Sequence, residues 1–281
     1  MPADLRLMCV LAHPDDESLG TGGILAKYAA EGVHTYLVTA TRGERGWSGP
    51  PGENPGLFEL GRIRQEELSC ASAILGLKEL VFLDYIDGEL DQANPQHITA
   101  ALVHQIRRIR PQVVVTFDGS GVYGHPDHIA ISQFTVGAVM AAADSSYEIE
   151  SQLPAHRVDK LYFTAITEKL AEDFQEIFGE IVMNVKGLDR RAVLWKDWAV
   201  TSLIDTSQHW RKVWEAVSCH CTQLPNYQAL LALPPEKHLQ LWGRQTFYRL
   251  FSLVNGGPVV ENDLFEGLRQ LPAPLVHGNK I

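Results

Sequence analysis

Short apolar segments alternate with segments of helical pattern between residues 5 and 170, and this alternation limits the fold more than any other feature of the chain. The apolar segments span residues 5–11, 33–41, 80–83, 112–117 and 160–166, and the helical ones span residues 22–31, 57–75, 96–108 and 126–143. Continuous apolar runs of this length are typical of parallel strands that are buried on both faces. The alternation therefore predicts an α/β fold with right-handed crossovers: a Rossmann-like, mostly parallel sheet flanked by helices.

The second half of the chain has a different pattern, which predicts a smaller helical and strand extension over residues 171–255. Its expected elements are two helices and one late strand, at residues 188–198, 207–221 and 244–254. The Pro- and Gly-containing segment 256–281 has no clear period and is expected to be a weakly organised tail. The sequence thus predicts one α/β domain over residues 1–255, with its core at residues 5–170.

The balance of charge restricts the partners that this chain can have. Its 281 residues carry a formal net charge of −10, which disfavours nucleic acid and anionic membrane surfaces as main partners. No apolar stretch is long enough to span a bilayer, and the N-terminal residues do not have the pattern of a secretory signal. We therefore expect a globular protein whose partner is a small molecule.

The cysteines predict a reducing environment. Cys9, Cys70, Cys219 and Cys221 do not have the spacing of a disulfide framework, and the economical interpretation is a cytoplasmic protein with four reduced cysteines. The sequence Cys219-His220-Cys221 resembles a metal-binding pattern, but residues two apart on a helix do not share a face. We therefore expect a structural or substrate-side role for His220.

Two clusters of histidine and aspartate follow expected strands. His13-Pro14-Asp15-Asp16-Glu17 comes directly after the first strand, and Tyr123-Gly124-His125-Pro126-Asp127-His128 comes after the fourth. Sites in parallel sheets lie beyond the carboxyl ends of the strands, and the first and fourth strands are often neighbours where the strand order reverses. The two clusters, far apart in sequence, are therefore expected to meet in space.

The residue types in these clusters indicate a metal site. A catalytic zinc takes about three protein ligands from His and carboxylate side chains, and His13, Asp16 and His128 would supply them. Zinc is the expected ion, although Fe(II) also suits two imidazoles and a carboxylate. Each such residue taken alone is more often a helix cap or a solvated side chain, but two His-Pro-Asp clusters after two buried strands favour the metal.

The remaining polar residues of the clusters have the chemistry of amide hydrolysis. Asp15 is not needed as a ligand and is expected to act as the general base on the attacking water. His125, as an imidazolium, is expected to stabilise the oxyanion and to protonate the departing amine. Asp127 would orient His125 through a ring nitrogen or support a ligand from behind, and plain helix capping is the alternative.

These motifs resemble those of the PIG-L/LmbE family of zinc-dependent N-deacetylases, over roughly residues 5–225. The resemblance rests on Ala12-His13-Pro14-Asp15-Asp16-Glu17 and His125-Pro126-Asp127-His128, with weaker likeness at Thr41-Arg42-Gly43-Glu44, around Arg64, at residues 84–90 and at His220-Cys221-Thr222-Gln223. It implies the same ligands and base, and it implies Arg64 and Asp87 as contacts to the sugar or its aglycone. Tyr123 either reaches the oxyanion or packs, and Glu17 is expected to support its loop.

The resemblance implies removal of an acetyl group from an N-acetylglucosaminyl conjugate, by an enzyme that is a homo-oligomer in many family members. Amide hydrolysis of a thiol S-conjugate, a nucleotide-binding module and a metal-binding regulator without turnover are the alternatives. The nucleotide-binding hypothesis rests on Gly20-Thr21-Gly22-Gly23, but Leu25 occupies the position of the third glycine of the dinucleotide fingerprint. The long loop 43–56 is expected to border the site, where Trp47 would stack on a sugar or serve as a surface anchor.

Overall fold

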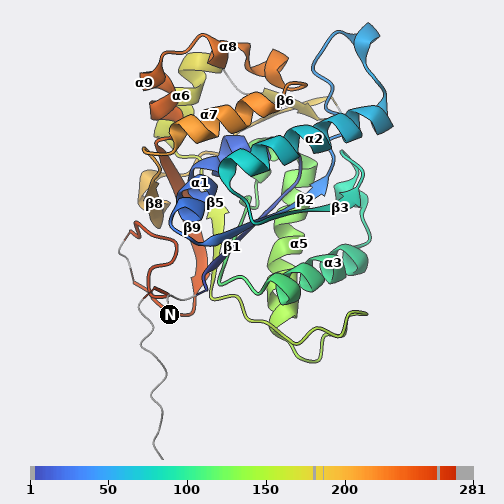
Figure 1. The fold of residues 1–281 in the computed structure, drawn as a ribbon, viewed down its shortest axis with the longest axis vertical. Coiled ribbons are helices and arrows are strands. Elements are labelled where there is room, and N and C mark those ends of the chain that lie inside the picture. The colour runs from blue at the N-terminus through green and yellow to red at the C-terminus, as the bar shows by residue number, and fades with distance from the viewer. Residues whose placement is uncertain (1–3, 180–181, 186, 258–259, 270–281) are drawn as a thin grey trace, which may run out of the picture.

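A seven-stranded sheet forms the centre of the computed structural model, which describes residues 4–179, 182–185, 187–257 and 260–269. The strand order is β3-β2-β1-β4-β5-β9-β8 (Figure 1). The strands are β1 (Arg6–Leu11), β2 (His34–Thr41), β3 (Glu79–Tyr85), β4 (Val113–Thr116), β5 (Lys160–Thr164), β8 (Ser202–Asp205) and β9 (Arg244–Ser252). The pairs from β3 to β5 are parallel, whereas β9 runs antiparallel to both β5 and β8. The predicted α/β fold with a mostly parallel sheet is confirmed.

The first strand lies at the centre of the sheet because it is apolar throughout. Residues 7–11 of β1 are fully buried, between β2 on one side and β4 on the other. The order of strands reverses between β1 and β4, since β2 and β3 extend the sheet one way and β5 extends it the other way. The expected neighbourhood of the first and fourth strands is confirmed, and it places their carboxyl ends side by side.

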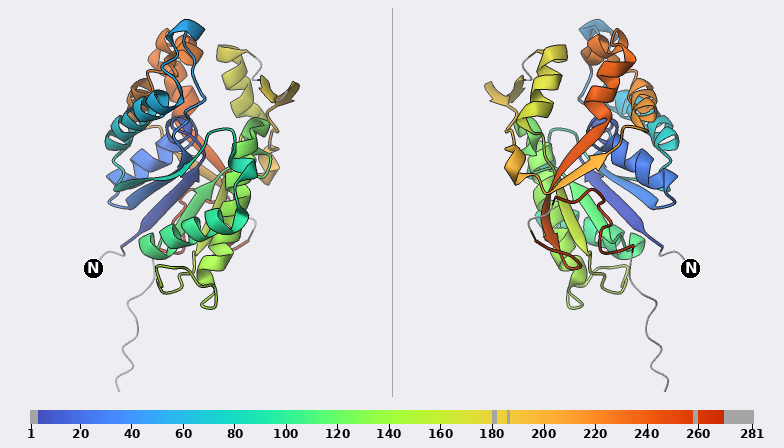
Figure 2. Two further views of the ribbon diagram at one scale, coloured as in Figure 1. Left: turned by 90° about the vertical axis from the view of Figure 1, so that its right-hand side faces the viewer. Right: turned by 90° about the vertical axis from the view of Figure 1, so that its left-hand side faces the viewer.

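Helices cover both faces of the sheet (Figure 2). One face carries α1 (Gly22–Ala30), α2 (Leu57–Leu75) and α7 (Trp210–Cys219), and the other carries α3 (Pro95–Ile109) and α5 (Pro126–Ala143). Their ends follow local sequence signals. The Asn94 side chain accepts the first free N–H groups of α3, and Gly76 ends α2 with a φ of 80°.

A smaller layer of structure lies beyond the carboxyl ends of β1 and β4, at the top of Figure 1. It contains the helices α6 (Glu168–Phe178), α8 (Gln228–Leu231) and α9 (Pro235–Trp242), and the two-stranded hairpin of β6 (Val182–Val185) and β7 (Leu188–Arg191). The expected helix at residues 188–198 is wrong, because this segment begins as β7 and continues as loop with a short 3-10 turn at Asp197–Ala199. The pairing of β7 with β6 overrides its local helical pattern.

Two further expectations need correction. Cys70 of α2 and Cys219 of α7 form a disulfide, so the prediction of four reduced cysteines is wrong for this pair. The segment expected to be a weakly organised tail is ordered over residues 260–269, where Leu264, Phe265 and Leu268 belong to the main hydrophobic core. Residues 270–281 of that segment lie outside the described residues.

No helix in the described part of the chain has both the length and the apolar composition that a membrane span requires.

Candidate functional site

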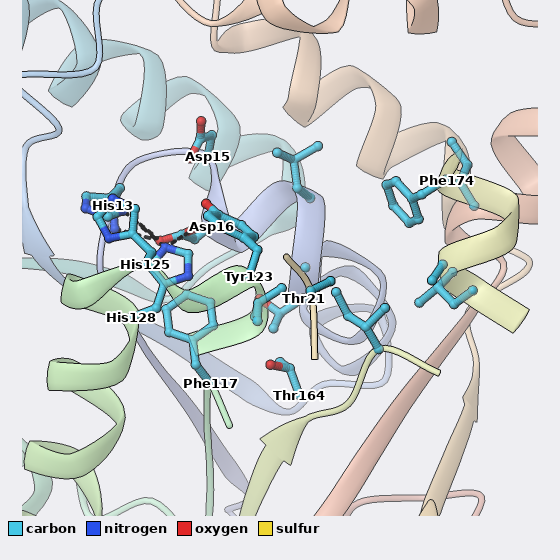
Figure 3. A pocket seen from close by; sticks show the side chains of 18 of the residues that line it. His13, Asp15, Asp16, Thr21, Phe117, Tyr123, His125, His128, Thr164 and Phe174 are labelled. Atoms are coloured by element: carbon cyan, nitrogen blue, oxygen red, sulfur yellow. Dashed lines mark hydrogen bonds and ion pairs between the residues drawn. The ribbon is translucent and has the colours of Figure 1, made fainter. Parts of the chain in front are cut away.

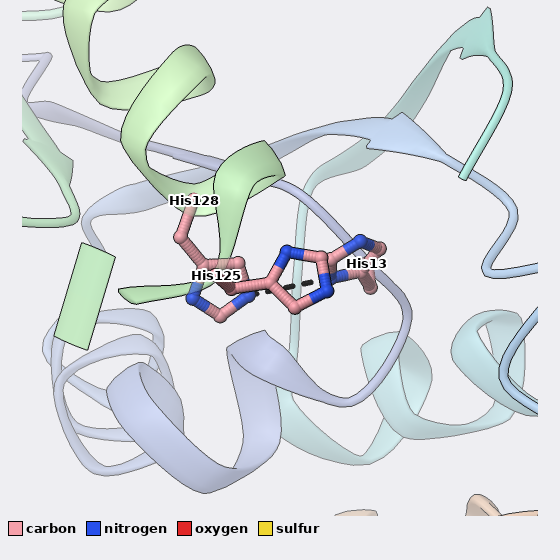
Figure 4. Close-up of side chains that lie close together, drawn as sticks. All are labelled: His13, His125 and His128. Atoms are coloured by element: carbon pink, nitrogen blue, oxygen red, sulfur yellow. Dashed lines mark hydrogen bonds between the residues drawn. The ribbon is translucent and has the colours of Figure 1, made fainter. Parts of the chain in front are cut away.

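The two histidine-aspartate clusters meet at the carboxyl ends of β1 and β4 (Figure 3). His13 follows β1, whereas His125 and His128 lie at the start of α5, which follows β4 (Figure 4). His13 Nδ1 lies 3.3 Å from His128 Nε2. The carboxylate of Asp16 lies 3.3 Å from His128 Nε2 through Oδ1 and 3.6 Å from His13 Nδ1 through Oδ2. All three expected metal ligands are thus brought together.

These separations fit a metal. Ligand atoms about 2.0–2.1 Å from a common tetrahedral ion lie roughly 3.4 Å apart. The three measured separations of 3.3, 3.3 and 3.6 Å agree with that spacing. Both imidazole nitrogens face each other across the site, and burial leaves His128 only 1% exposed. Two imidazoles and one carboxylate are a donor set that can hold a divalent metal ion.

A second group of carboxylates lies behind His13. Its Nε2 is 3.1 Å from Asp87 Oδ1 and 3.2 Å from Asp127 Oδ2. Asp127 is fully buried and also accepts the backbone N–H groups of Gly88 and Leu90. The part of the expectation in which Asp127 orients the His125 ring is wrong, because its carboxylate faces His13. A carboxylate on the far nitrogen of a ligating imidazole fixes its tautomer and raises its basicity.

Two overlapping sets of side chains have ligand atoms within 4.8 Å of one another: His13 with His125 and His128, and His13 with Asp87 and Asp127. His13 faces His128 through Nδ1, whereas it faces Asp87 and Asp127 through Nε2. Burial disfavours the charged form of His13, but hydrogen bonds to Asp127, Asp16 and Asp87 outweigh it and raise its pKa well above its usual value. The convergence of these His and Asp ligand atoms forms a site able to bind a metal at this position.

Neighbouring side chains fix the ligands in place. The ring of Phe117 stacks on His128, with centroids 4.0 Å apart and planes 1° apart. The backbone N–H of His13 donates to Asp16 Oδ2 at 2.7 Å, which ties the carboxylate to its own turn. Burial opposes ionisation of Asp16, but His128 and His13 keep its pKa well below the usual range. Asp16 is therefore ionised, as a ligand must be.

Asp15 lies beside the ligands in an unusual backbone conformation, with a φ of 108°. Its Oδ2 is 3.4 Å from Arg64 Nη2 and accepts a hydrogen bond from the Tyr227 hydroxyl at 3.3 Å. Burial raises the pKa of Asp15 to about 6, against the opposing charge of Arg64. Strained backbone of this kind is frequent at functional sites, where the surrounding structure has to hold it.

Arg64 and Glu17 support this turn from either side. Arg64 is only 3% exposed, and its guanidinium donates to the backbone oxygens of Gly43 and Pro14. Glu17 is fully buried, accepts the N–H of Asp15 at 2.9 Å and lies 2.8 Å from His220 Nε2. Burial lowers the pKa of His220, but Glu17 outweighs this effect and raises it. The expected role of Glu17 in supporting the loop is confirmed, and His220 has the structural place foreseen for it.

Tyr123 and His125 face the ligands from the second cluster. Burial and the Asp16 charge raise the pKa of Tyr123 well above its usual value, so its phenol is a hydrogen-bond donor. Burial and the charges of His13 and His128 lower the pKa of His125 to about 4. The backbone N–H of Asp127 donates to His125 Nδ1 at 3.1 Å, which places the proton of the neutral ring on Nε2. Burial and this contact favour the neutral ring of His125 over the expected imidazolium.

The clusters line a cavity of about 830 Å³. Arg64, Asp87 and Tyr123 line it, as expected of contacts to a substrate, together with the three expected ligands. Within the described residues, the loop 43–56 contributes Gly46 to the lining, and Trp47 is not among the lining residues. Trp47 instead donates to the backbone oxygen of Pro50 in its own loop. The expectation that Trp47 stacks on a sugar is therefore wrong for this structure.

Sequence reasoning missed two residues at the site. Phe117, which stacks on His128, lies at the end of the fourth expected strand, and its apolar side chain gives no signal of a role at the site. Tyr227 lies more than 200 residues from Asp15, in the turn between α7 and α8, and no local motif marks it. Only the packing of the C-terminal helices brings the Tyr227 hydroxyl into the cavity.

Named relatives match the chain over most of its length. Residues 8–139 match the family model described as PIG-L, GlcNAc-PI de-N-acetylase. The 1D-myo-inositol 2-acetamido-2-deoxy-alpha-D-glucopyranoside deacetylase of Thermobispora bispora is 35% identical over 303 residues, covering 95% of this chain and 99% of that protein. The protein of the same name from Thermobifida fusca is 38% identical over 251 residues, covering 79% of this chain and 84% of that protein.

Solved structures share the fold. A conserved protein from Thermus thermophilus aligns with a TM-score of 0.63 and 26% identity, covering 90% of this chain and 97% of that chain. The N,N'-diacetylchitobiose deacetylase from Pyrococcus horikoshii aligns with a TM-score of 0.64 over 87% of this chain and 83% of that chain, and at 18% identity it shows the fold alone. Since relatives at 35% identity extend along nearly the whole sequence, this chain belongs to the PIG-L/LmbE family and is a hydrolase of the N-deacetylase class.

Proposed function

We propose that this chain removes the acetyl group from an N-acetylglucosamine unit joined to inositol or to a similar polyol, with a zinc ion held by His13, Asp16 and His128. The relatives from Thermobispora bispora and Thermobifida fusca carry the name of such a deacetylase. The observation that carries the proposal is the convergence of two imidazole nitrogens and one carboxylate within 3.3–3.6 Å at one end of a substrate-sized cavity. Asp15 and Tyr123 border this convergence from two sides.

Each residue of the cluster has a separate task in this proposal. A bound divalent ion supplies a Lewis acid and makes water a stronger acid. Asp15 takes the proton of the attacking water and passes it to the departing nitrogen. Tyr123 and the Nε2–H of His125 donate hydrogen bonds to the carbonyl oxygen as it gains negative charge. Asp127 positions His13 through its far nitrogen, and Asp87 acts in the same way.

Arg64 and Asp87 border the part of the cavity that suits a polyhydroxylated group. Arg64 has its guanidinium tied to backbone oxygens, and Asp87 accepts the backbone N–H of Arg45 at 3.1 Å. Burial raises the pKa of Asp87, but His13 outweighs it and the pKa falls to about 2, so this carboxylate is ionised. A charged and hydrogen-bonded rim of this kind can exchange hydrogen bonds with sugar hydroxyls, which an apolar wall cannot.

Acetate release and metal content test the proposal together. The purified protein is assayed on a panel of N-acetylated glucosamine conjugates, including the inositol conjugate, and its zinc and iron are measured by elemental analysis. We expect acetate release that is lost on chelation and restored by zinc. Full activity after thorough chelation would contradict the metal, and release of a mercapturate from thiol S-conjugates, without acetate release, would contradict the substrate.

A further inference from the structure

The cavity beside the ligand cluster has two chemically different ends. The ligands, Asp15 and Arg64 lie at one end. The opposite end, which we call the apolar arm, is lined by Leu19, Ile166, Leu170, Phe174, Leu194 and Leu241. Figure 3 shows Phe174 across the cavity from His13 and Asp15, with Thr21 and Thr164 between them. A ligand that spans the cavity therefore contacts polar groups at the end with the metal ligands and hydrocarbon side chains at the other end.

The side chains of the apolar arm are held in place by the hydrophobic residues packed behind them. Leu170 and Phe174 project from α6, and both remain partly exposed although they are hydrophobic, because they face the cavity. Leu19 and Phe174 are backed by a buried cluster of Trp210, Val213, Val217, Leu230, Leu241 and Trp242. Water beside such a wall gains few hydrogen bonds from it, so an alkyl group that replaces this water is stabilised.

An acetyl group leaves most of this surface uncovered. The cavity of about 830 Å³ is near the upper end of the range of roughly 300–1,000 Å³ that is typical of small-molecule sites. The acetyl group presents a single methyl beyond the carbonyl carbon. The exposed side chains of Gln175 and Arg244 also line the cavity, so its lining reaches the molecular surface beyond this wall.

The two ends fix the direction in which an amide can lie. The carbonyl carbon at the ligand cluster has two substituents, the nitrogen with its sugar and the acyl chain. Sugar hydroxyls beside Leu170, Phe174 and Leu241 would lose hydrogen bonds with water and regain fewer of them than beside Arg64 and Asp87. The sugar therefore takes the end with Arg64 and Asp87, and the acyl chain points toward Leu170 and Phe174.

We propose that the apolar arm is an acyl-chain subsite, and that this chain hydrolyses amino-sugar amides whose acyl group is longer than acetyl. The inference rests on the proposed function, since it names the acyl group that the same site accepts. The reaction stays a hydrolysis: water oxygen bonds to the carbonyl carbon, the C–N bond breaks, and the amine leaves with a proton from water, giving a free carboxylic acid.

A series of N-acyl glucosamine conjugates that share one sugar tests this subsite. The release of the common amine is followed for the acetyl, butanoyl, hexanoyl and octanoyl amides. Each methylene buried in the arm is expected to raise kcat/KM about fourfold until the arm is filled. We expect the hexanoyl amide to exceed the acetyl amide at least about tenfold. An acetyl amide that is hydrolysed faster than every longer amide would overturn the subsite and leave the proposed function standing.

Leu170→Trp narrows the arm and tests its location. We expect this variant to lower the ratio of hexanoyl to acetyl kcat/KM at least about tenfold. Leu231→Trp is the matched control, because Leu231 is 58% exposed on α8 and does not line the cavity. A ratio that falls equally in both variants would overturn the placement of the acyl chain.

Two more measurements separate the remaining outcomes. An octyl glycoside of N-acetylglucosamine places the same hydrocarbon on the aglycone. If its kcat/KM rises and that of the hexanoyl amide does not, the arm binds the aglycone and the acyl assignment is overturned. Calorimetry on the metal-free protein provides a readout apart from turnover: N-hexanoylglucosamine should bind more tightly than N-acetylglucosamine, and Leu170→Trp should remove the difference. Absence of turnover for every amide, the acetyl included, would instead contradict the proposed function.

Discussion

Asp15 combines a positive φ with a largely buried carboxylate that contacts Arg64 and Tyr227. The φ of 108° is outside the regions that a non-glycine residue normally adopts. Hydrogen bonds hold the residue there: Glu17 accepts its N–H, and its own carbonyl oxygen accepts the N–H of Leu19. The turn after β1 thus directs the adjacent side chains of Asp15 and Asp16 to different places: Asp16 lies among the proposed metal ligands, and Asp15 lies beside them.

Asp15→Asn should lower kcat by about 10²–10⁴-fold, since the amide cannot accept the proton of the attacking water. Bound zinc, measured by elemental analysis, should stay near the level of the unmodified protein because Asp15 is not among the proposed ligands. Asp84→Asn is the control: Asp84 also has a positive φ, of 62°, and also pairs with an arginine, Arg42, but does not line the cavity. Turnover by Asp15→Asn equal to that of the control would refute the assignment as base.

Asp127→Asn should weaken zinc binding by about 10–100-fold, because the neutral amide no longer fixes the proton on His13 Nε2. Competition with a chelator of known affinity measures the effect. Asp144→Asn, at the opposite end of the same helix α5, changes an exposed aspartate and should leave zinc affinity unchanged. If both variants retain full affinity, Asp127 does not position the ligand.

At the scale of elements, α1 approaches the C-terminal strands so closely that only glycine fits at one position. A Cβ on Gly23 would lie 2.8 Å from Thr206 Cβ and 2.9 Å from Gln245 Oε1. The same Gln245 oxygen accepts the N–H of Ile24, and its amide nitrogen donates to the carbonyl oxygen of Gly20 at 2.9 Å. This contact joins the start of α1, close behind the site, to β9.

Gly23→Ala should therefore lower the free energy of unfolding by about 1–3 kcal/mol, because the added methyl group overpacks this contact. Gly137→Ala is the matched control in the exposed face of α5, where an added methyl group would meet no neighbouring side chain within 4 Å. There, alanine should stabilise the helix by roughly 0.5–1 kcal/mol. Urea denaturation of both variants measures the two effects, and a stabilising Gly23→Ala would show that the contact is looser than described.

At the scale of the whole molecule, residues 260–269 are anchored to the sheet by a buried ion pair. Glu261 is 2% exposed and Lys160 of β5 is fully buried, with Oε1 and Nζ 2.6 Å apart. Around Glu261 lie Tyr162 of β5, Arg249 of β9, Ser202 of β8 and Asn255. Burial raises the pKa of Glu261, but hydrogen bonds from Lys160, Asn255 and Tyr162 outweigh it and keep the pKa below its ordinary value of 4.5.

Glu261→Gln should lower the free energy of unfolding by about 3–5 kcal/mol at pH 7, because the charge of Lys160 stays buried without its partner. Because the folded pKa of Glu261 is lowered, its stabilisation is complete above pH 4.5 and is lost as the pH falls through the folded pKa. The difference between the two proteins, measured by urea denaturation, should therefore shrink below about pH 4.5.

Glu176→Gln is the control for this pair. Glu176 and Lys237 are also 2.6 Å apart, but Glu176 is 60% exposed, so its loss should change the free energy of unfolding by less than about 1 kcal/mol. Equal changes in the free energy of unfolding in the two variants would show that burial does not make the Glu261 ion pair more important for stability than an exposed pair.

The sequence by itself determined the central fold and the identity of the clusters. Apolar runs and helical periods are local, so β1, β2, β4 and their helices were predicted within a few residues, and parallel topology then required the two clusters to meet. Their residue types indicated a metal before any distance was known. Side-chain contacts between residues far apart in the chain had no local signal in the sequence, because they depend on which surfaces pack together.

Tertiary structure alone decided the arrangement around the clusters. It turned Asp127 toward His13, favoured the neutral ring of His125 through burial, and brought the Tyr227 hydroxyl to Asp15. It also built the apolar arm largely from α6, α9 and the segment after β7, in a region where the sequence predicted only a smaller helical and strand extension. These features arise from contacts between residues far apart in the chain, and a local pattern carries no information on burial or on which carboxylate faces which ring.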